Sequence, residues 1–169
     1  MKTIKIGLST KEINRAIKDL VAYKQDVLKK TDLLQERVSE RLAEEAGEGF
    51  SGAIVDDIIQ GPKKAQVNVI IDHRGEITVV IAKGKDAVWV EFGSGVYHNS
   101  SLGSSPHPKG AELGFTIGDY GKGMGKKRTW GFYENGELML THGTPAKMPM
   151  YNAVKTVCEE ISEIAREIF

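Results

Sequence analysis

The chain has 169 residues, 40% of them hydrophobic, and its 23 basic side chains balance 23 acidic ones. This length buries a core without disulfides or metals, and a formal net charge of zero excludes the basic field of a dedicated nucleic-acid binder. One cysteine, Cys158, excludes an internal disulfide framework and indicates a reducing compartment. No stretch approaches the ~18 apolar residues of a membrane span, and the N-terminus lacks the apolar run of a signal peptide. We expect one domain over residues 1–169 and no membrane partner.

The first sixty residues are predicted to be mostly helical. Residues 2–8 alternate between apolar and polar side chains, which indicates a short strand or an extended arm. Ser9 and Glu12 form a capping box, so a helix is expected to start there. A second, short helix is expected within residues 50–59, before Gly61 stops it.

The helix that begins at the capping box is predicted to be long. No Gly or Pro interrupts it before Gly47, which together with Gly49 is expected to end it. A break near Asp32 is one alternative. A coiled coil is another, although Lys24 and Thr31 lie in its seam and weaken it. The apolar residues recur at steps of three, four or seven: Ile13, Ile17, Leu20, Val27, Leu34 and Val38.

Two segments rich in β-branched residues follow. Residues 67–72 and 77–83 predict a β-hairpin, and Arg74-Gly75 supplies its turn. Residues 87–92 then fit either a third strand or one or two helical turns, because periodicity cannot decide the conformation of six residues.

A single carboxylate, Glu91, lies between the aromatic residues Trp89 and Phe92. The simpler interpretation is a surface glutamate on an amphipathic segment. A carboxylate removed from water needs hydrogen-bond donors or a cation, however, and the nearest donors are the N–H groups of residues 93–95. The alternative interpretation is therefore a carboxylate that fixes the turn at Gly93.

The C-terminal half is predicted to contain a long loop, a hairpin and a helix. Residues 96–129 include seven glycines and few apolar residues, and ordering each residue costs about 1–2 kcal/mol. We expect this loop to be mobile in the free chain and to become ordered on contact with neighbours. Asn135-Gly136 predicts a hairpin with a type I′ turn. A last helix is expected from Pro149 or Met150, with Cys158 in its apolar stripe.

These elements predict an α+β fold. A long N-terminal helix and a C-terminal helix are expected to pack on a small antiparallel or mixed sheet, with a long Gly-rich loop. The parts of the single domain are the N-terminal helix region (9–46), the hairpin and motif (67–95), the flexible loop (96–129), and the hairpin with the C-terminal helix (130–169).

No motif for catalysis or cofactor binding is complete. The glycine-rich stretch 121–127 lacks the spacing, strand and helix of a phosphate-binding loop, and Cys158 is expected to be buried and inert. The sequence therefore predicts no catalytic residue, no cofactor and no metal site. Two alternatives stay open, a zinc site and a DNA-contacting loop. The candidate zinc ligands are Glu91, His98, His107 and His142, and the basic loop residues are Lys122, Lys126, Lys127 and Arg128.

Two short motifs flank the loop. The first is A-V-W-V-E-F-G-S-G at residues 87–95, and the second is H-G-T-P-A-K-M-P-M at residues 142–150, where the last helix begins. Their order resembles the tail-completion (neck, head–tail joining) proteins of long-tailed phages. Ser94 stands where threonine is frequent in that family, and the loop is longer than the family pattern. The motif residues are Trp89, Glu91, Phe92, Gly93, Gly95, His142, Gly143 and Pro149.

This resemblance implies a non-enzymatic virion structural protein at the head–tail junction, present in the host cytoplasm during assembly. The implied assembly is a homo-oligomeric ring, of six copies by the family resemblance, that binds other neck and tail proteins. Transient DNA contact through the basic loop is an additional expectation. The resemblance also favours a helical turn for residues 87–92.

Overall fold

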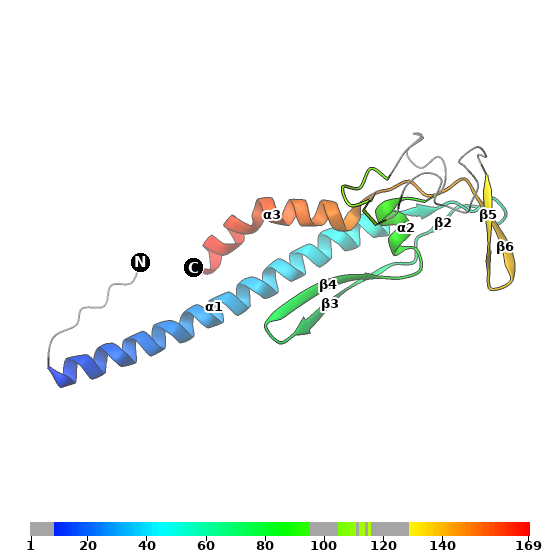
Figure 1. Ribbon diagram of the computed structural model, residues 1–169. Coiled ribbons are helices and arrows are strands. Elements are labelled where there is room, and N and C mark those ends of the chain that lie inside the picture. Colours follow the sequence, from blue (N-terminus) through cyan, green and yellow to red (C-terminus); the bar gives the residue numbers. More distant parts are fainter. Residues whose placement is uncertain (1–8, 95–104, 111, 114, 116–128) are drawn as a thin grey trace. The chain divides into compact units, whose positions relative to one another are not determined.

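The structure is a computed structural model that describes residues 9–94, 105–110, 112, 113, 115 and 129–169 (Figure 1). Long helices and small antiparallel sheets confirm the predicted α+β fold. The chain divides into two compact units, Met1–Val38 with Glu160–Phe169, and Ser39–Glu159. The prediction of a single domain stays a prediction. The strand or arm expected at residues 2–8 lies outside the described residues.

Helix α1 (Thr10–Ser51) begins at the predicted capping box. Ser9 Oγ accepts the Glu12 N–H at 3.3 Å and donates to Glu12 Oε2 at 2.6 Å, while the Ser9 N–H donates to the same carboxylate. Hydrogen bonds from the Ser9 side chain and then its backbone hold the pKa of the Glu12 carboxyl below its ordinary value. The helix continues without the break considered near Asp32.

The expected end of α1 at Gly47 is wrong, because the helix runs on to Ser51. A glycine inside a helix costs only about 1 kcal/mol, and Ala46 and Phe50 on either side are buried. At Gly49, a Cβ atom would lie 2.7 Å from the Cβ of Pro149. The second glycine therefore permits a close approach of the segment that begins the last helix.

These two glycines give a matched test of helix packing. Gly47→Ala is expected to raise the free energy of unfolding by about 0.5–1 kcal/mol, since nothing lies near the added methyl group and alanine favours helix. Gly49→Ala is expected to lower it by about 1–2 kcal/mol, because the methyl group overlaps Pro149. Urea unfolding of both variants measures the difference, and two changes of the same sign would contradict it.

The short helix predicted within residues 50–59 is also wrong. Strands β1 (Ile54–Val55) and β2 (Lys63–Lys64) form a small antiparallel ribbon there. The carboxylate of Asp57 accepts the N–H groups of Ile59 and Gln60, both at 3.0 Å. Asp57 thus holds a turn between the two strands, as aspartate side chains that bond nearby backbone N–H groups commonly do.

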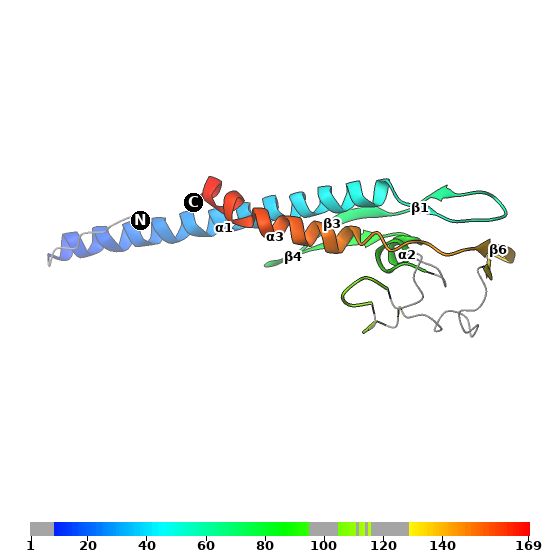
Figure 2. The ribbon, with the colours of Figure 1, turned by 90° about the horizontal axis from the view of Figure 1, so that it is seen from above.

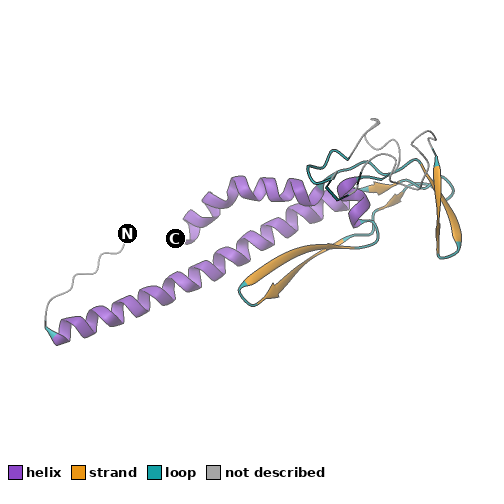
Figure 3. Ribbon diagram, in the orientation of Figure 1, coloured by secondary structure: helices purple, strands orange, loops and turns teal. Residues whose placement is uncertain are grey.

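The two predicted hairpins are confirmed. Strands β3 (Asn68–Arg74) and β4 (Ile77–Lys83) pair in antiparallel register. Strands β5 (Trp130–Glu134) and β6 (Glu137–Thr141) pair around Asn135-Gly136, whose φ angles of 51° and 85° fit the predicted type I′ turn. In the described residues the strands form three sheets of two strands each (Figure 3).

Between the hairpins, residues Ala87–Phe92 form the short helix α2, so the helical alternative for this motif is confirmed. The last helix, α3 (Pro149–Ile168), begins where the sequence predicts. The views in Figures 1 and 2 both place α2 beside the start of α3. Buried Phe50, Ala53 and Val90 form the core there. Partly buried apolar side chains surround it: Val55, Ala65, Val67, Val69, Ala82 and Met150.

The apolar stripe predicted for α3, which includes Val157 and Cys158, matches only part of the face that is buried. Pro149, Ala153 and Val157 are buried at steps of four residues, whereas Cys158 is exposed. The expectation of a buried Cys158 is therefore wrong. The close approach at Pro149 favours small residues on the buried face, and a search for large apolar side chains misses Ala153.

Candidate functional site

The first feature of the site is a link between α2 and the N-terminus of α3. Glu91 is only 6% exposed, and its carboxylate oxygens accept the N–H groups of Met150 at 2.8 Å and of Tyr151 at 3.0 Å. N–H groups in the first turn of a helix have no partner within the helix, and a negative charge there is favourable. Glu91 therefore caps α3 from another helix.

The donors predicted for Glu91 are wrong. The Gly93 N–H donates to the Trp89 carbonyl at 2.8 Å, and the Ser94 N–H donates to the Thr144 carbonyl at 2.8 Å. Gly95 lies outside the described residues. The sequence correctly identifies a carboxylate that requires donors, but these donors come from residues far along the chain.

Besides the two N–H groups of α3, Glu91 has a buried side-chain neighbour, His107. Its Nδ1 accepts the Lys109 N–H at 3.0 Å, so the ring proton is on Nε2, which lies 3.3 Å from Glu91 Oε1. The two side chains are each 8% exposed. The imidazole thus lies beside the same carboxylate that caps α3.

Aromatic packing attaches this histidine segment to α2. The ring of Phe92 stacks on Phe115 with centroids 4.4 Å apart and also contacts the His107 ring at 4.4 Å. Ser105 is buried, and its backbone N–H donates to the Phe115 carbonyl at 2.8 Å. Part of the predicted loop 96–129 is therefore packed against the domain, which corrects that prediction for residues 105–110 and 115.

Residues 96–104, 111, 114 and 116–128 of the loop lie outside the described residues. These include His98 and all four basic residues proposed for assembly or DNA contact: Lys122, Lys126, Lys127 and Arg128.

The two sequence motifs meet in space. Ser94 and Thr144 form an antiparallel bridge through two backbone hydrogen bonds of 2.8 and 2.9 Å. The Lys147 N–H donates to the Val90 carbonyl at 2.9 Å, and Glu91 then holds the start of α3. The structure thus joins residues about fifty positions apart into one local site.

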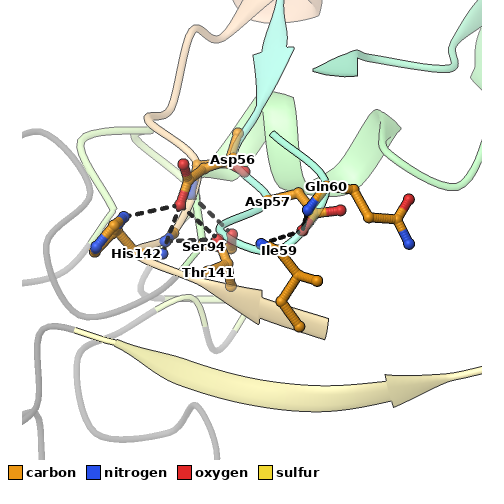
Figure 4. Close-up of polar contacts among 9 residues, drawn as sticks. Asp56, Asp57, Ile59, Gln60, Ser94, Thr141 and His142 are labelled. Atoms are coloured by element: carbon orange, nitrogen blue, oxygen red, sulfur yellow. Dashed lines mark hydrogen bonds and ion pairs between the residues drawn. The ribbon is translucent and has the colours of Figure 1, made fainter. Parts of the chain in front are cut away.

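A second polar cluster surrounds Asp56 (Figure 4). Its Oδ2 atom accepts the His142 N–H at 2.7 Å, contacts His142 Nδ1 at 3.1 Å and accepts the Thr141 hydroxyl at 3.2 Å. The Thr141 hydroxyl oxygen in turn accepts the Gly143 N–H at 2.9 Å. These bonds shape the turn after β6, and they explain why the second motif begins with His142 and Gly143.

The candidate zinc ligands are not gathered as a set. Glu91 lies with His107, whereas His142 lies with Asp56. Within the part of the chain that the structure describes, no group of three or more His, Cys, Asp or Glu side chains could hold a metal ion.

A cavity of about 340 Å³ lies between the ribbons β1–β2 and β5–β6. Apolar side chains of Val55, Trp89, Phe132 and Met139 line part of it. Two of the three lysines on its wall form ion pairs, since Lys63 pairs with Asp57 at 3.0 Å and Lys85 pairs with Glu134 at 3.4 Å. Sequence reasoning did not find this cavity, because its lining comes from separate segments with no shared motif.

The Asp57 carboxylate is expected to make stability depend on pH. The N–H of Gln60 and then the Lys63 ammonium hold the pKa of Asp57 below its ordinary value of 3.8. Because the folded pKa is the lower one, this stabilisation is present above the ordinary value and is lost as pH falls through the folded value. Asp57→Asn should lower the melting temperature at neutral pH and reduce its decline in acid. The exposed Asp32→Asn is the control, and an equal shift at every pH would contradict the prediction.

Comparisons with protein-family models, with curated proteins and with solved structures found no match to this chain. Among the described helices, none has the length and apolar character needed to cross a membrane. The candidate site therefore rests on its own geometry, a joint between two motifs in which buried polar groups bond one another.

Proposed function

We propose that this chain is a non-enzymatic virion protein, a tail-completion or neck component that assembles with copies of itself as a ring at the head–tail junction of a long-tailed phage. The observation that supports this most is the contact between the two motifs that carry the family resemblance. Glu91 in the first motif caps the helix that the second motif begins. The two motifs thus serve one structural purpose, which explains why they occur together.

The use of the buried polar groups supports a structural role. Glu91, His107, Ser94 and Thr144 are all buried, and each bonds another group of the same site. A general base or nucleophile needs to reach a substrate atom, whereas these groups are directed at backbone N–H groups and one another. Their arrangement can hold two helices and a loop segment together.

Exposed apolar side chains support assembly with other subunits. Ile77, at the tip of the β3–β4 hairpin, is 64% exposed, and Tyr133 on β5 is 76% exposed. Two-stranded ribbons are marginally stable alone, so contact with a neighbouring subunit would stabilise them. A ring would cover such groups by using two different surfaces of each copy.

Purification of the full chain, light scattering and negative-stain electron microscopy test the proposal. We expect closed rings with a central opening, and an antibody against the chain should label the head–tail junction of phage particles from the source organism. Monomers at high concentration, open filaments, or label only on the capsid or the tail tip would contradict it.

A further inference from the structure

The N-terminal part of α1 exposes an apolar stripe. In the unit formed by Met1–Val38 and Glu160–Phe169, Ile17 is 53% exposed and Leu20 is 49% exposed. Other large apolar side chains on this part of the helix are also more than two-fifths exposed: Ile13, Val21, Tyr23 and Leu28. Scattered exposed apolar residues are common, but a continuous stripe over four turns marks a contact surface.

This part of α1 has two sharply different faces. At 100° per residue, the apolar side chains from Ile13 to Leu28 cover an arc of about 160°, with Lys24 as the one charged residue within it. The opposite face is polar except for Ala22, and its polar residues include Lys11, Asn14, Arg15, Lys18, Asp19, Gln25, Asp26 and Lys29. The arc exceeds the narrow seam of a two-helix coiled coil, so it is wide enough for more than one partner helix.

The same stripe already has a helix partner further along the chain. The Lys30 ammonium lies 5.7 Å from the centre of the Phe169 ring, at the end of α3, and Val27, Leu34 and Val38 are half-buried. Figures 1 and 2 both show the last turns of α3 beside α1. Since α3 ends at Ile168, it does not extend over the stripe from Ile13 to Leu28.

We propose that residues 13–28 of α1 form the helix–helix contact between copies of this chain. The stripe is continuous with the seam that α3 occupies, so a helix is the kind of partner that it fits. A second copy offers a helix of the same length and pattern, and a net charge of zero opposes self-association less than a strong net charge would. Because the face is wider than one seam, each α1 can contact the α1 of two neighbours.

This inference rests on the proposed self-assembly, but its test is separate. Leu20→Glu places a carboxylate in the centre of the apolar face, and Ala22→Glu places one on the opposite face of the same helix turn. Both positions are exposed, so both variants should keep the helix content and melting temperature of the wild-type protein. Analytical ultracentrifugation of the full chain, with a monomer mass of 18.5 kDa, measures association.

The wild-type chain and Ala22→Glu should form the same oligomer. Leu20→Glu should raise the dissociation constant at least tenfold, and Ile17→Glu with Leu20→Glu should leave only monomer. Equal association of Leu20→Glu and Ala22→Glu overturns the contact. A wild-type monomer that associates only after residues 2–8 are deleted also overturns it, because the chain's own N-terminal segment then covers the stripe.

The two proposals can fail independently. Rings that persist in the Ile17→Glu, Leu20→Glu double variant contradict the α1 contact and leave the ring proposal intact. An oligomer that depends on Leu20 but forms no closed ring contradicts the proposed neck function and supports the α1 contact.

Discussion

Glu91→Ala is expected to lower the free energy of unfolding by about 3 kcal/mol. The substitution removes the acceptor for the N–H groups of Met150 and Tyr151 and leaves His107 Nε2 without its carboxylate. Each buried donor without a partner costs about 1–3 kcal/mol, and partial relaxation reduces the sum. For a chain of this size the melting temperature should fall by about 6–12 °C.

Glu91→Gln removes the negative charge of the side chain but keeps part of its hydrogen bonding. The amide oxygen can still accept one N–H group of α3, but the amide NH₂ group then meets a second donor, either the other N–H group or His107 Nε2. We expect about half the effect of Glu91→Ala. Glu163→Ala removes an exposed glutamate from α3 and should change stability by less than about 0.5 kcal/mol. Equal melting shifts for the Glu91 and Glu163 variants would contradict the capping role.

The sequence predicts those elements whose signals lie within a few residues. The capping box at Ser9 and Glu12 and the turn at Asn135-Gly136 each depend on neighbouring groups, and the structure confirms both. The β3–β4 hairpin is equally local, since its β-branched residues and its turn are contiguous. These signals suffice for the α+β class and for most element boundaries.

Longer-range partners could not be predicted in the same way. A buried carboxylate at Glu91 follows from its apolar neighbours, but its donors lie 59 and 60 residues further on. Nothing near Glu91 in the sequence points to the start of α3. The resemblance to neck proteins concerns the order of the two motifs along the chain. Their contact in space is visible only in the fold.

Small residues account for two further errors. Gly47 resembles a helix end in the sequence, and Cys158 resembles a core residue in the last helix. The approach of Gly49 to Pro149 and the burial of Ala153 instead favour small side chains over large ones. Periodicity of large apolar residues therefore places Val157 correctly on the buried face of α3 but misses Ala153 and includes the exposed Cys158.

Gly84→Ala is expected to destabilise the fold by at least about 3 kcal/mol. Gly84 connects β4 to α2, and a Cβ atom there would lie 2.9 Å from both the Gln66 carbonyl carbon and Val67 Cα, and closer still to the carbonyl oxygen. These are backbone atoms, which cannot move aside as a flexible side chain can. The Gln66 N–H is also held by the Asp86 carboxylate at 2.7 Å, just before α2. Relief of the overlap would therefore displace the helix that carries Glu91.

Gly61→Ala provides the matched control for Gly84→Ala. Both glycines have a positive φ angle, 83° at Gly61 and 157° at Gly84, but nothing lies within 4 Å of a Cβ atom at Gly61. Gly61→Ala should therefore cost only the conformational penalty of about 1–2 kcal/mol. Urea unfolding of both variants isolates the backbone overlap. If Gly84→Ala lowers the free energy of unfolding no more than Gly61→Ala does, the β4–α2 connection shifts without cost. Gly84 then does not fix the position of α2.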